Sequence, residues 1–183
     1  MEKEVVVFCN EDGTPTGEVG PKLESHTAHT KLHLAFSCYL FRKSDNKFLM
    51  TRRALSKRVW PGVWTNSVCG HLAPKETMEN AIRRRAQFEL GLEKIDDIKN
   101  IIPDYIYTTT PFNGIVDHEF CPVFVGCIED DPKPNPEEVE DWMWVDWNAF
   151  VRMMVRTPDK MSWWAKDQYK LLKDHEPFRS LEK

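Results

Sequence analysis

The sequence of 183 residues lacks the features that define several broad classes of protein. Its longest apolar stretches, such as residues 34–41, are far shorter than the roughly 20 residues that a membrane-spanning helix requires. It contains no internal repeat and no glycine-rich fingerprint of the kind that holds a flavin or a dinucleotide. We therefore expect one domain over residues 1–183, with no membrane partner and no organic cofactor.

An excess of positive charge is also absent. The chain carries 25 Lys and Arg against 29 Asp and Glu, a net charge of −4, whereas nucleic acids and anionic membranes are bound chiefly through surplus Lys and Arg. Neither is expected as a partner. Basic residues do gather locally, in residues 52–58 and 83–85, although such runs usually form a solvated face.

The cysteines are too few and too irregular for a disulfide framework. There are five, an odd number without regular spacing, which is typical of a reducing compartment. The segment Met-Glu-Lys-Glu at the start lacks the basic and apolar regions of a secretory signal. We predict a cytoplasmic protein, a monomer or weak dimer, in which at least one thiol is free for chemistry.

Hydrophobic periodicity predicts a mixture of strands and helices. Strands are expected at residues 4–9, 32–41, 48–51, 63–68, 106–109, 115–125 and 142–147, and short helices at 148–156 and 162–172. The clearest helix is residues 77–90, where Met78, Ala81, Ile82, Ala86 and Leu90 share one face and Gly91 supplies the stop. Residues 129–141, acidic with three prolines, are expected as a surface loop before a C-terminal part, 142–183, that packs on the core.

Several side chains could together hold a metal ion. His26, His29 and His33 lie close in sequence, and His71 follows in Cys-Gly-His. In an alternating strand, Asp117 and Glu119 share a side with Ile115 and Cys121. Two carboxylates on an apolar strand are costly to bury unless a cation or a proton compensates them, and imidazole with carboxylate suits zinc or another divalent metal. Spacing alone leaves His29 a candidate and places His118 on the opposite face.

The segment from Gly70 to Leu92 resembles the Nudix box, a loop-helix-loop that holds a divalent cation against a diphosphate. It follows the pattern Gly-x5-Glu-x7-Arg and ends in Glu-Leu-Gly-Leu, with Glu76, Arg84, Glu89 and Gly91 at fixed positions. The hydrolase pattern has Glu after the Arg and two consecutive Glu near the helix end, where this chain has Arg85 and then Phe88 before Glu89. Losing two carboxylates removes much of the charge that would hold hydrolytic metals.

Three further segments resemble the type I isopentenyl-diphosphate isomerases, a branch of the Nudix superfamily. They are Thr-Arg-Arg-Ala-Leu-Ser-Lys from Thr51, Trp-Pro-Gly-Val-Trp-Thr-Asn-Ser-Val-Cys-Gly-His from Trp60, and Gly-Ile-Val-Asp-His-Glu-Phe-Cys-Pro from Gly114. The likeness covers residues 16–164. It implies an α+β fold, a Nudix-like α/β/α sandwich with a mixed central sheet, and interconversion of isopentenyl and dimethylallyl diphosphate.

The resemblance also implies roles for individual residues. Cys69 and Glu119 would transfer protons on opposite sides of the alkene, with Tyr107 assisting Glu119, while Trp164 or its neighbour Trp163 would face the hydrocarbon. A tightly held Mn²⁺, Zn²⁺ or Mg²⁺ would be bound by His26, His33, His71, Asp117 and Glu119, leaving His29 a bystander. Glu89 would hold a Mg²⁺ that touches the diphosphate, and the diphosphate would contact Lys22, Arg53, Lys57 and Arg85. Asp117 departs from the family, which usually has Glu there.

Two other functions compete with this expectation. A Nudix pyrophosphohydrolase acting on a nucleoside diphosphate derivative would share the fold and the metal requirement, although Arg85 and Phe88 count against it. A noncatalytic module stabilised by a metal would use Cys69 and the histidines as structural ligands. Structural zinc sites prefer several cysteines. The other cysteines here, such as Cys9, Cys38 and Cys127, are interpreted as small apolar residues of the core.

Overall fold

The structure is a computed structural model that describes residues 4–173, 175 and 178. The ends of the predicted domain, including residues 179–183, lie outside the described residues. In chain order the elements are β1 (Val5–Cys9), β2 (Pro15–Pro21), α1 (Lys22–Ser25), β3 (His33–Arg42), β4 (Phe48–Arg53), β5 (Trp64–Thr65), β6 (Val68–His71), α2 (Met78–Leu90), β7 (Asp96–Ile102), β8 (Ile106–Thr108), β9 (His118–Phe120), β10 (Val123–Ile128), β11 (Val139–Val145), α3 (Trp147–Arg156), η1 (Pro158–Lys160) and α4 (Trp163–Leu172).

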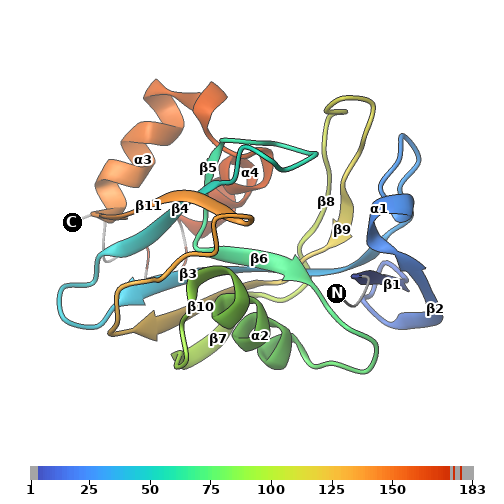
Figure 1. Cartoon of the computed structure of the whole chain (residues 1–183), viewed down its shortest axis with the longest axis horizontal. Helices are drawn as coiled ribbons and strands as arrows, with labels where there is room; N and C mark the ends of the chain where they lie inside the picture. Colours follow the sequence, from blue (N-terminus) through green and yellow to red (C-terminus); the bar gives the residue numbers. More distant parts are fainter. Residues whose placement is uncertain (1–3, 174, 176–177, 179–183) are drawn as a thin grey trace.

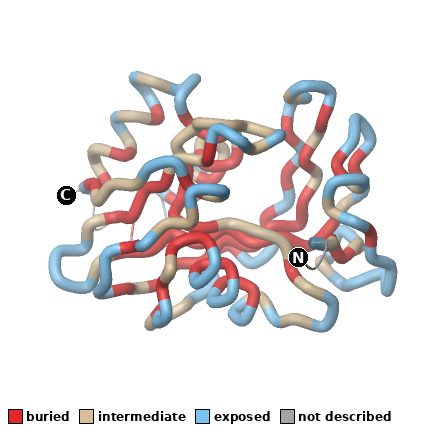
Figure 2. Tube along the Cα trace, in the orientation of Figure 1, coloured by how far each residue is buried: buried red, intermediate tan, exposed pale blue. Residues whose placement is uncertain are grey.

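Strand β3 is the centre of the molecule. It pairs with β10 and β9 in parallel and with β1, β4 and β6 in antiparallel orientation, so the sheet is mixed, as predicted. Its apolar residues pack on both faces, Tyr39 and Phe41 on one side and Phe36 and Leu40 on the other. A strand covered on both faces is expected to be apolar throughout, which explains its unbroken hydrophobic sequence. Figure 2 shows the buried trace running through this sheet.

Helices cover both faces of the sheet (Figure 1). On one side α2 contributes Ile82 and Leu90 to a buried cluster with Phe36. On the other side α3 and α4 contribute Trp147 and Trp164 to the second cluster. The predicted α/β/α sandwich is therefore confirmed. In the part of the chain that the structure describes, every helix is too short or too polar to cross a membrane.

Helix α2 begins and ends where the sequence predicts. The Thr77 hydroxyl accepts the backbone N–H of Asn80 at 3.3 Å, and Gly91 ends the helix in the left-handed conformation with φ of 63°. The amide of Gly91 then donates to the carbonyl of Gln87, the bond of an αL cap, and the amide of Leu92 donates to the carbonyl of Ala86. These local signals fix the helix that carries Arg85 and Glu89.

Two predicted strands are interrupted in the structure. Residues 63–68 form the separate strands β5 and β6, because the side chains of Asn66 and Ser67 hydrogen-bond to the backbones of β3 and β4. Residues 115–125 form β9 and β10, separated at Cys121 and Pro122, and proline has no N–H to donate to a sheet. Predicting one strand in each place was wrong, although the segments do lie in the sheet.

Three further regions differ from expectation. Strands β2 and β7 were not predicted, since β2 begins inside a turn-like Gly and Pro segment and β7 is rich in charged residues. Residues 139–141, expected at the end of the surface loop, begin β11 instead. Glu138, just before them, is not solvated like its neighbours but pairs with Arg85 and Lys57.

Replacing Gly91 with Ala should destabilise the fold by about 2 kcal/mol or more. An alanine there would adopt φ of 63°, and its Cβ would lie 3.0 Å from the Lys133 carbonyl oxygen. Gly114→Ala is the control, because Gly114 has φ of 75° with no atom within 4 Å of the added Cβ, and it should lose only about 1 kcal/mol. Urea unfolding of both variants measures the difference, and equal losses would contradict the close approach to Lys133.

Candidate active site

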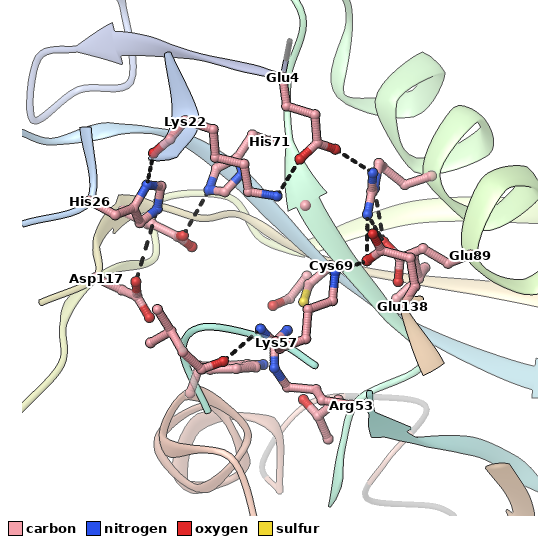
Figure 3. Close-up of a pocket in the computed structure, with 18 of the residues that line it drawn as sticks. Glu4, Lys22, His26, Arg53, Lys57, Cys69, His71, Glu89, Asp117 and Glu138 are labelled. Atoms are coloured by element: carbon pink, nitrogen blue, oxygen red, sulfur yellow. Dashed lines mark hydrogen bonds and ion pairs between the residues drawn. The ribbon is translucent and has the colours of Figure 1, made fainter. Parts of the chain in front are cut away.

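A cavity of about 470 Å³ opens beside the sheet between β6, β9, α2 and α4. All of the site residues predicted from the sequence line it except His33, which lies behind its wall. Figure 3 shows their arrangement: His26, His71 and Asp117 lie on one side, Glu89 and Glu138 on the other, and Cys69 between them. The structure thus brings residues from distant parts of the chain to one hollow.

Three histidines and a carboxylate converge at one end of this cavity. His26, His33, His71 and Glu119 each offer one potential ligand atom, and these four atoms all lie within 4.8 Å of one another. His26 follows α1, His33 begins β3, His71 ends β6 and Glu119 lies in β9. Because β3 pairs with both β6 and β9, the sheet itself places the last three together.

Backbone carbonyls set the protonation of two of the imidazoles. The Nδ1 atoms of His26 and His33 lie 2.6 Å and 2.9 Å from the carbonyl oxygens of Lys22 and Lys31. A carbonyl only accepts, so Nδ1 carries a proton, which in the neutral imidazole leaves the lone pair on Nε2. The Nε2 atom of His33 is buried without a hydrogen-bond partner among the described residues. Imidazoles oriented in this way are typical of metal ligands, so the donor set fits a divalent cation.

Glu119 is the charged centre of this cluster. Its Oε1 lies 3.1 Å from His71 Nε2 and 3.7 Å from His33 Nε2, and its Oε2 accepts the Tyr107 hydroxyl at 2.7 Å. Burial raises the pKa of Glu119, but the nearness of the His33 and His71 imidazoles outweighs it and holds the pKa well below its usual range. Burial in turn lowers the pKa of His71 to about 3. The carboxylate is therefore ionised.

Asp117 lies beside the cluster but outside the set of four. Its Oδ1 is 4.0 Å from His26 Nε2, and burial together with the charge of Glu119 raises its pKa to about 6. The structure leaves its predicted role as a ligand untested. His29 is exposed and outside the cluster, while His118 faces the Thr30 carbonyl, in agreement with the roles inferred for both.

Cys69 lies across the cavity from the aromatic wall formed by α4. Its strand, β6, pairs with β3 so that Cys69 is opposite Ser37. Burial and the charge of Glu89 raise the pKa of the thiol to about 12, so Cys69 is protonated where Glu119 is ionised. A thiol and a carboxylate with separated protonation states thus line one cavity, and their part in proton transfer stays a prediction.

The cations of the opposite wall are held by carboxylates. Arg85, almost fully buried, donates to Glu89 at 2.8 Å, to Glu4 at 2.6 Å and to Glu138 at 3.1 Å. Lys57 also binds Glu138, and Lys22 binds Glu4 at 2.6 Å. Sequence reasoning missed Glu4 and Glu138 because neither belongs to a motif. Glu4 directly precedes β1 and Glu138 directly precedes β11, but the residues around them in the sequence do not indicate a distant arginine partner.

Aromatic side chains close the cavity. Trp164 lines it, whereas Trp163 stacks on Tyr107 with 5.5 Å between ring centroids, so Trp164 faces the hollow and Trp163 supports Tyr107. The Arg53 guanidinium lies 5.4 Å from the Trp164 ring and donates to the carbonyls of Val59 and Trp60. Arg53 therefore links the aromatic wall to the loop after β4.

Comparison with known proteins identifies the class and then the family. Residues 31–172 match the NUDIX domain family, so the chain is a NUDIX domain protein. It is 46% identical over 169 residues to the isopentenyl-diphosphate Delta-isomerase of Agromyces mediolanus, covering 92% of this chain and 81% of the relative. It is 46% identical over 164 residues to that of Salmonella paratyphi B, covering 90% and 89%. The chain belongs to the isopentenyl-diphosphate Delta-isomerase family.

Solved structures agree on the fold. A Deinococcus radiodurans protein superimposes with a TM-score of 0.68 at 18% identity, over 93% of this chain and 98% of the other. The MutT protein of Methanosarcina mazei Go1 gives 0.61 at 18% identity, over 83% and 96%. Identities this low establish the shared fold alone.

Removing His33 should abolish tight binding of a divalent metal. We expect His33→Ala to weaken the binding of Zn²⁺ or Mn²⁺ by at least about tenfold. The substitution removes an oriented ring nitrogen that has no hydrogen-bond partner among the described residues. Metal content after equilibrium dialysis and the rise in melting temperature on adding metal measure this. His29→Ala is the matched control and should bind as the wild type does. Unchanged metal binding by His33→Ala would exclude the cluster as the metal site.

Proposed function

We propose that this protein interconverts isopentenyl diphosphate and dimethylallyl diphosphate, moving a double bond by adding a proton at one carbon and removing one from another. The observation that supports the proposal most directly is the pairing of the Cys69 thiol with the Glu119 carboxylate in one cavity. Beside that pair lie an aromatic wall, a histidine cluster and a group of cations. Family membership points to the same reaction.

The reaction requires a cavity without free water. An unactivated alkene is a weak base, and its protonation produces a tertiary carbocation that water would capture. Trp164 and Tyr107, which both line the cavity, can exclude water from the hydrocarbon end and present aromatic faces to the cation, an attraction of about 1 to 2 kcal/mol when desolvated. The thiol and carboxylate exchange roles with the direction of reaction, one delivering a proton and the other removing one.

Divalent metals fit two places in the cavity. We assign one, Mn²⁺, Zn²⁺ or Mg²⁺, to His26, His33, His71 and Glu119, with Asp117 as a further candidate ligand. When bound, such a metal supplies positive charge that fixes the Glu119 carboxylate and lowers its proton affinity. We assign Mg²⁺, bound with the diphosphate, to Glu89. Tyr107, which donates to Glu119, holds the carboxylate in position from the other side.

The cationic wall is the proposed diphosphate site. Lys22, Arg53, Lys57 and Arg85 all line the cavity, and the planar guanidinium groups suit diphosphate oxygens. Binding energy from the diphosphate, which does not react, would hold the small hydrocarbon tail between Cys69 and Glu119. The site would thus use charge at one end and apolar contact at the other.

The wider setting of the protein follows from the same features. All five cysteines are free, which fits the reducing cytoplasm. The substrate we assign is a small prenyl diphosphate, and the acidic net charge disfavours nucleic acid and anionic membranes as partners. We propose a monomer or a weak dimer, with the cavity formed by one chain.

Hydrolysis of a nucleoside diphosphate derivative is the alternative activity. Arg85 forms an ion pair with Glu89, and Phe88 is exposed, at positions where the hydrolase pattern carries carboxylates. Their replacement reduces the negative charge available for hydrolytic metals. Rapid metal-dependent release of phosphate from nucleotides, without allylic product from isopentenyl diphosphate, would favour the hydrolase.

Cys69→Ala and Glu119→Gln should each lower kcat by at least about 10³-fold, because either change removes one of the two proton-transfer groups. The measurement is conversion of isopentenyl diphosphate in deuterated water with Mg²⁺, following label into dimethylallyl diphosphate. Cys127→Ala, which alters a cysteine outside the cavity, is the control and should keep wild-type activity. Full activity in either of the first two variants would refute the assignment.

Lys22→Ala should raise KM for isopentenyl diphosphate about tenfold with little change in kcat, because it removes a contact made equally in the ground and transition states. Steady-state kinetics of this variant test the diphosphate site. Lys31→Ala provides the comparison, since Lys31 is exposed and pairs only loosely with Glu18 at 3.7 Å. A fall in kcat at constant KM would place Lys22 in the proton-transfer step instead.

A further inference from the structure

A fully buried amide, Asn66, lies directly behind the aromatic wall of the cavity. It occupies the break between β5 and β6, three residues before Cys69, and none of its surface is exposed. Its Oδ1 accepts the indole N–H of Trp164 at 3.0 Å and the Thr65 hydroxyl at 2.8 Å. The segment that carries Cys69 is therefore tied to the helix that carries Trp164.

The orientation of this amide is fixed by the backbone. The Nδ2 atom donates to the Val68 carbonyl at 3.0 Å and to the Cys38 carbonyl at 3.3 Å. Carbonyls cannot donate, so the NH₂ group must face them and Oδ1 must face the indole. All hydrogen-bonding capacity of the side chain is used, and a rotated amide would leave two donors facing each other. Asn66 thus offers Trp164 an acceptor at one position only.

The indole ring has a second anchor on its face. The Arg53 guanidinium lies 5.4 Å from the ring centroid and is itself held by the carbonyls of Val59 and Trp60. An edge contact to Asn66 and a face contact to Arg53 together define both the position of the ring and its rotation. Without the edge contact, a buried N–H would be left unsatisfied, and the ring would be free to turn away.

We propose that Asn66 is a positioning residue of the isomerase reaction, acting through Trp164 by holding the indole face toward the site of the carbocation. This inference rests on the proposed function and adds a residue that no motif argument assigns. Cation–π attraction depends on the cation lying over the ring face, so a rotated ring loses it. The loss falls on the transition state, while the diphosphate contacts on the opposite wall remain.

A double-mutant cycle in full-length protein tests the proposal. Asn66→Ala should lower kcat about 10- to 50-fold and leave KM for isopentenyl diphosphate within about twofold. Trp164→Phe, which keeps a ring but has no N–H, should lower kcat about tenfold. The kcat of the double variant should lie within about threefold of the kcat of the less active single variant, because the effects of groups that act through one another are not additive. Losses that multiply, or a raised KM with unchanged kcat, would overturn the proposal.

A comparison variant separates positioning from simple support of the fold. Ser67→Ala removes hydrogen bonds to Leu49 and Leu40 from the same segment but does not touch Trp164. Its loss should multiply with that of Trp164→Phe. Non-additivity for Ser67 as large as for Asn66 would mean that the whole segment, and not the amide, is responsible. If Asn66→Ala does not fold, Asn66→Ser replaces it in the cycle.

A spectroscopic measurement does not depend on activity. In protein labelled with ¹⁵N-tryptophan, the indole N–H resonance of Trp164 is identified by its loss in Trp164→Phe. Its hydrogen exchange should be at least about tenfold faster in Asn66→Ala than in the wild type, because the buried bond is gone. Unchanged exchange would overturn the positioning role. Wild-type protein that fails to convert isopentenyl diphosphate, yet shows the faster exchange in the variant, would refute the proposed function alone.

Discussion

The structure depends above all on compensating charge among buried side chains around one cavity. An ionised group taken out of water costs several kcal/mol unless it is paired, and this cavity contains many such groups. Glu119 is held by two histidines and a tyrosine, and Arg85 by three carboxylates. Because these partners come from β1, β3, β6, β8, α2 and β11 or their flanks, the pairing of charge also connects distant segments of the chain. Gly70 leaves room for the Arg85 side chain, since a Cβ at position 70 would lie 3.0 Å from it.

Within that constraint, the cavity divides its charges by position. The histidine cluster and Glu119 occupy one end, and the carboxylates that neutralise Arg85 and Lys57 occupy the other, with Cys69 between them (Figure 3). The aromatic rings of Trp164 in α4 and Tyr107 in β8 also line the cavity. A ligand that matches this cavity has a strongly charged group for the cations and a short apolar part for the surface of Cys69, Tyr107 and Trp164. A prenyl diphosphate has both parts, whereas a nucleotide has no short hydrocarbon part.

The sequence predicts the elements whose signals are local and misses the contacts that are not. The apolar period of residues 77–90 and the glycine after it define α2 completely, and the two-sided burial of β3 explains its continuous apolar sequence. The pairing of Glu4 and Glu138 with Arg85 has no such signal, because the partners are separated by 81 and 53 residues. Spacing alone also leaves both His29 and His33 as candidate metal ligands. Spacing treats them alike, and only the extended path of β3 places His33 beside Glu119.

Helix α2 differs from the hydrolase pattern at Arg85 and Phe88, and Arg85 has the clearer consequence for the site. Arg85 stands where the hydrolase pattern has a carboxylate. It forms ion pairs with Glu89, one helical turn later in α2, and with Glu138. A cation that belongs to the protein thereby neutralises part of the carboxylate charge that would otherwise hold hydrolytic metals. The same cation, being permanently charged, favours a bound diphosphate as a ligand. The side chains of the site therefore distinguish this protein from the hydrolase pattern while the fold does not, so structural likeness to hydrolases gives no information about the reaction.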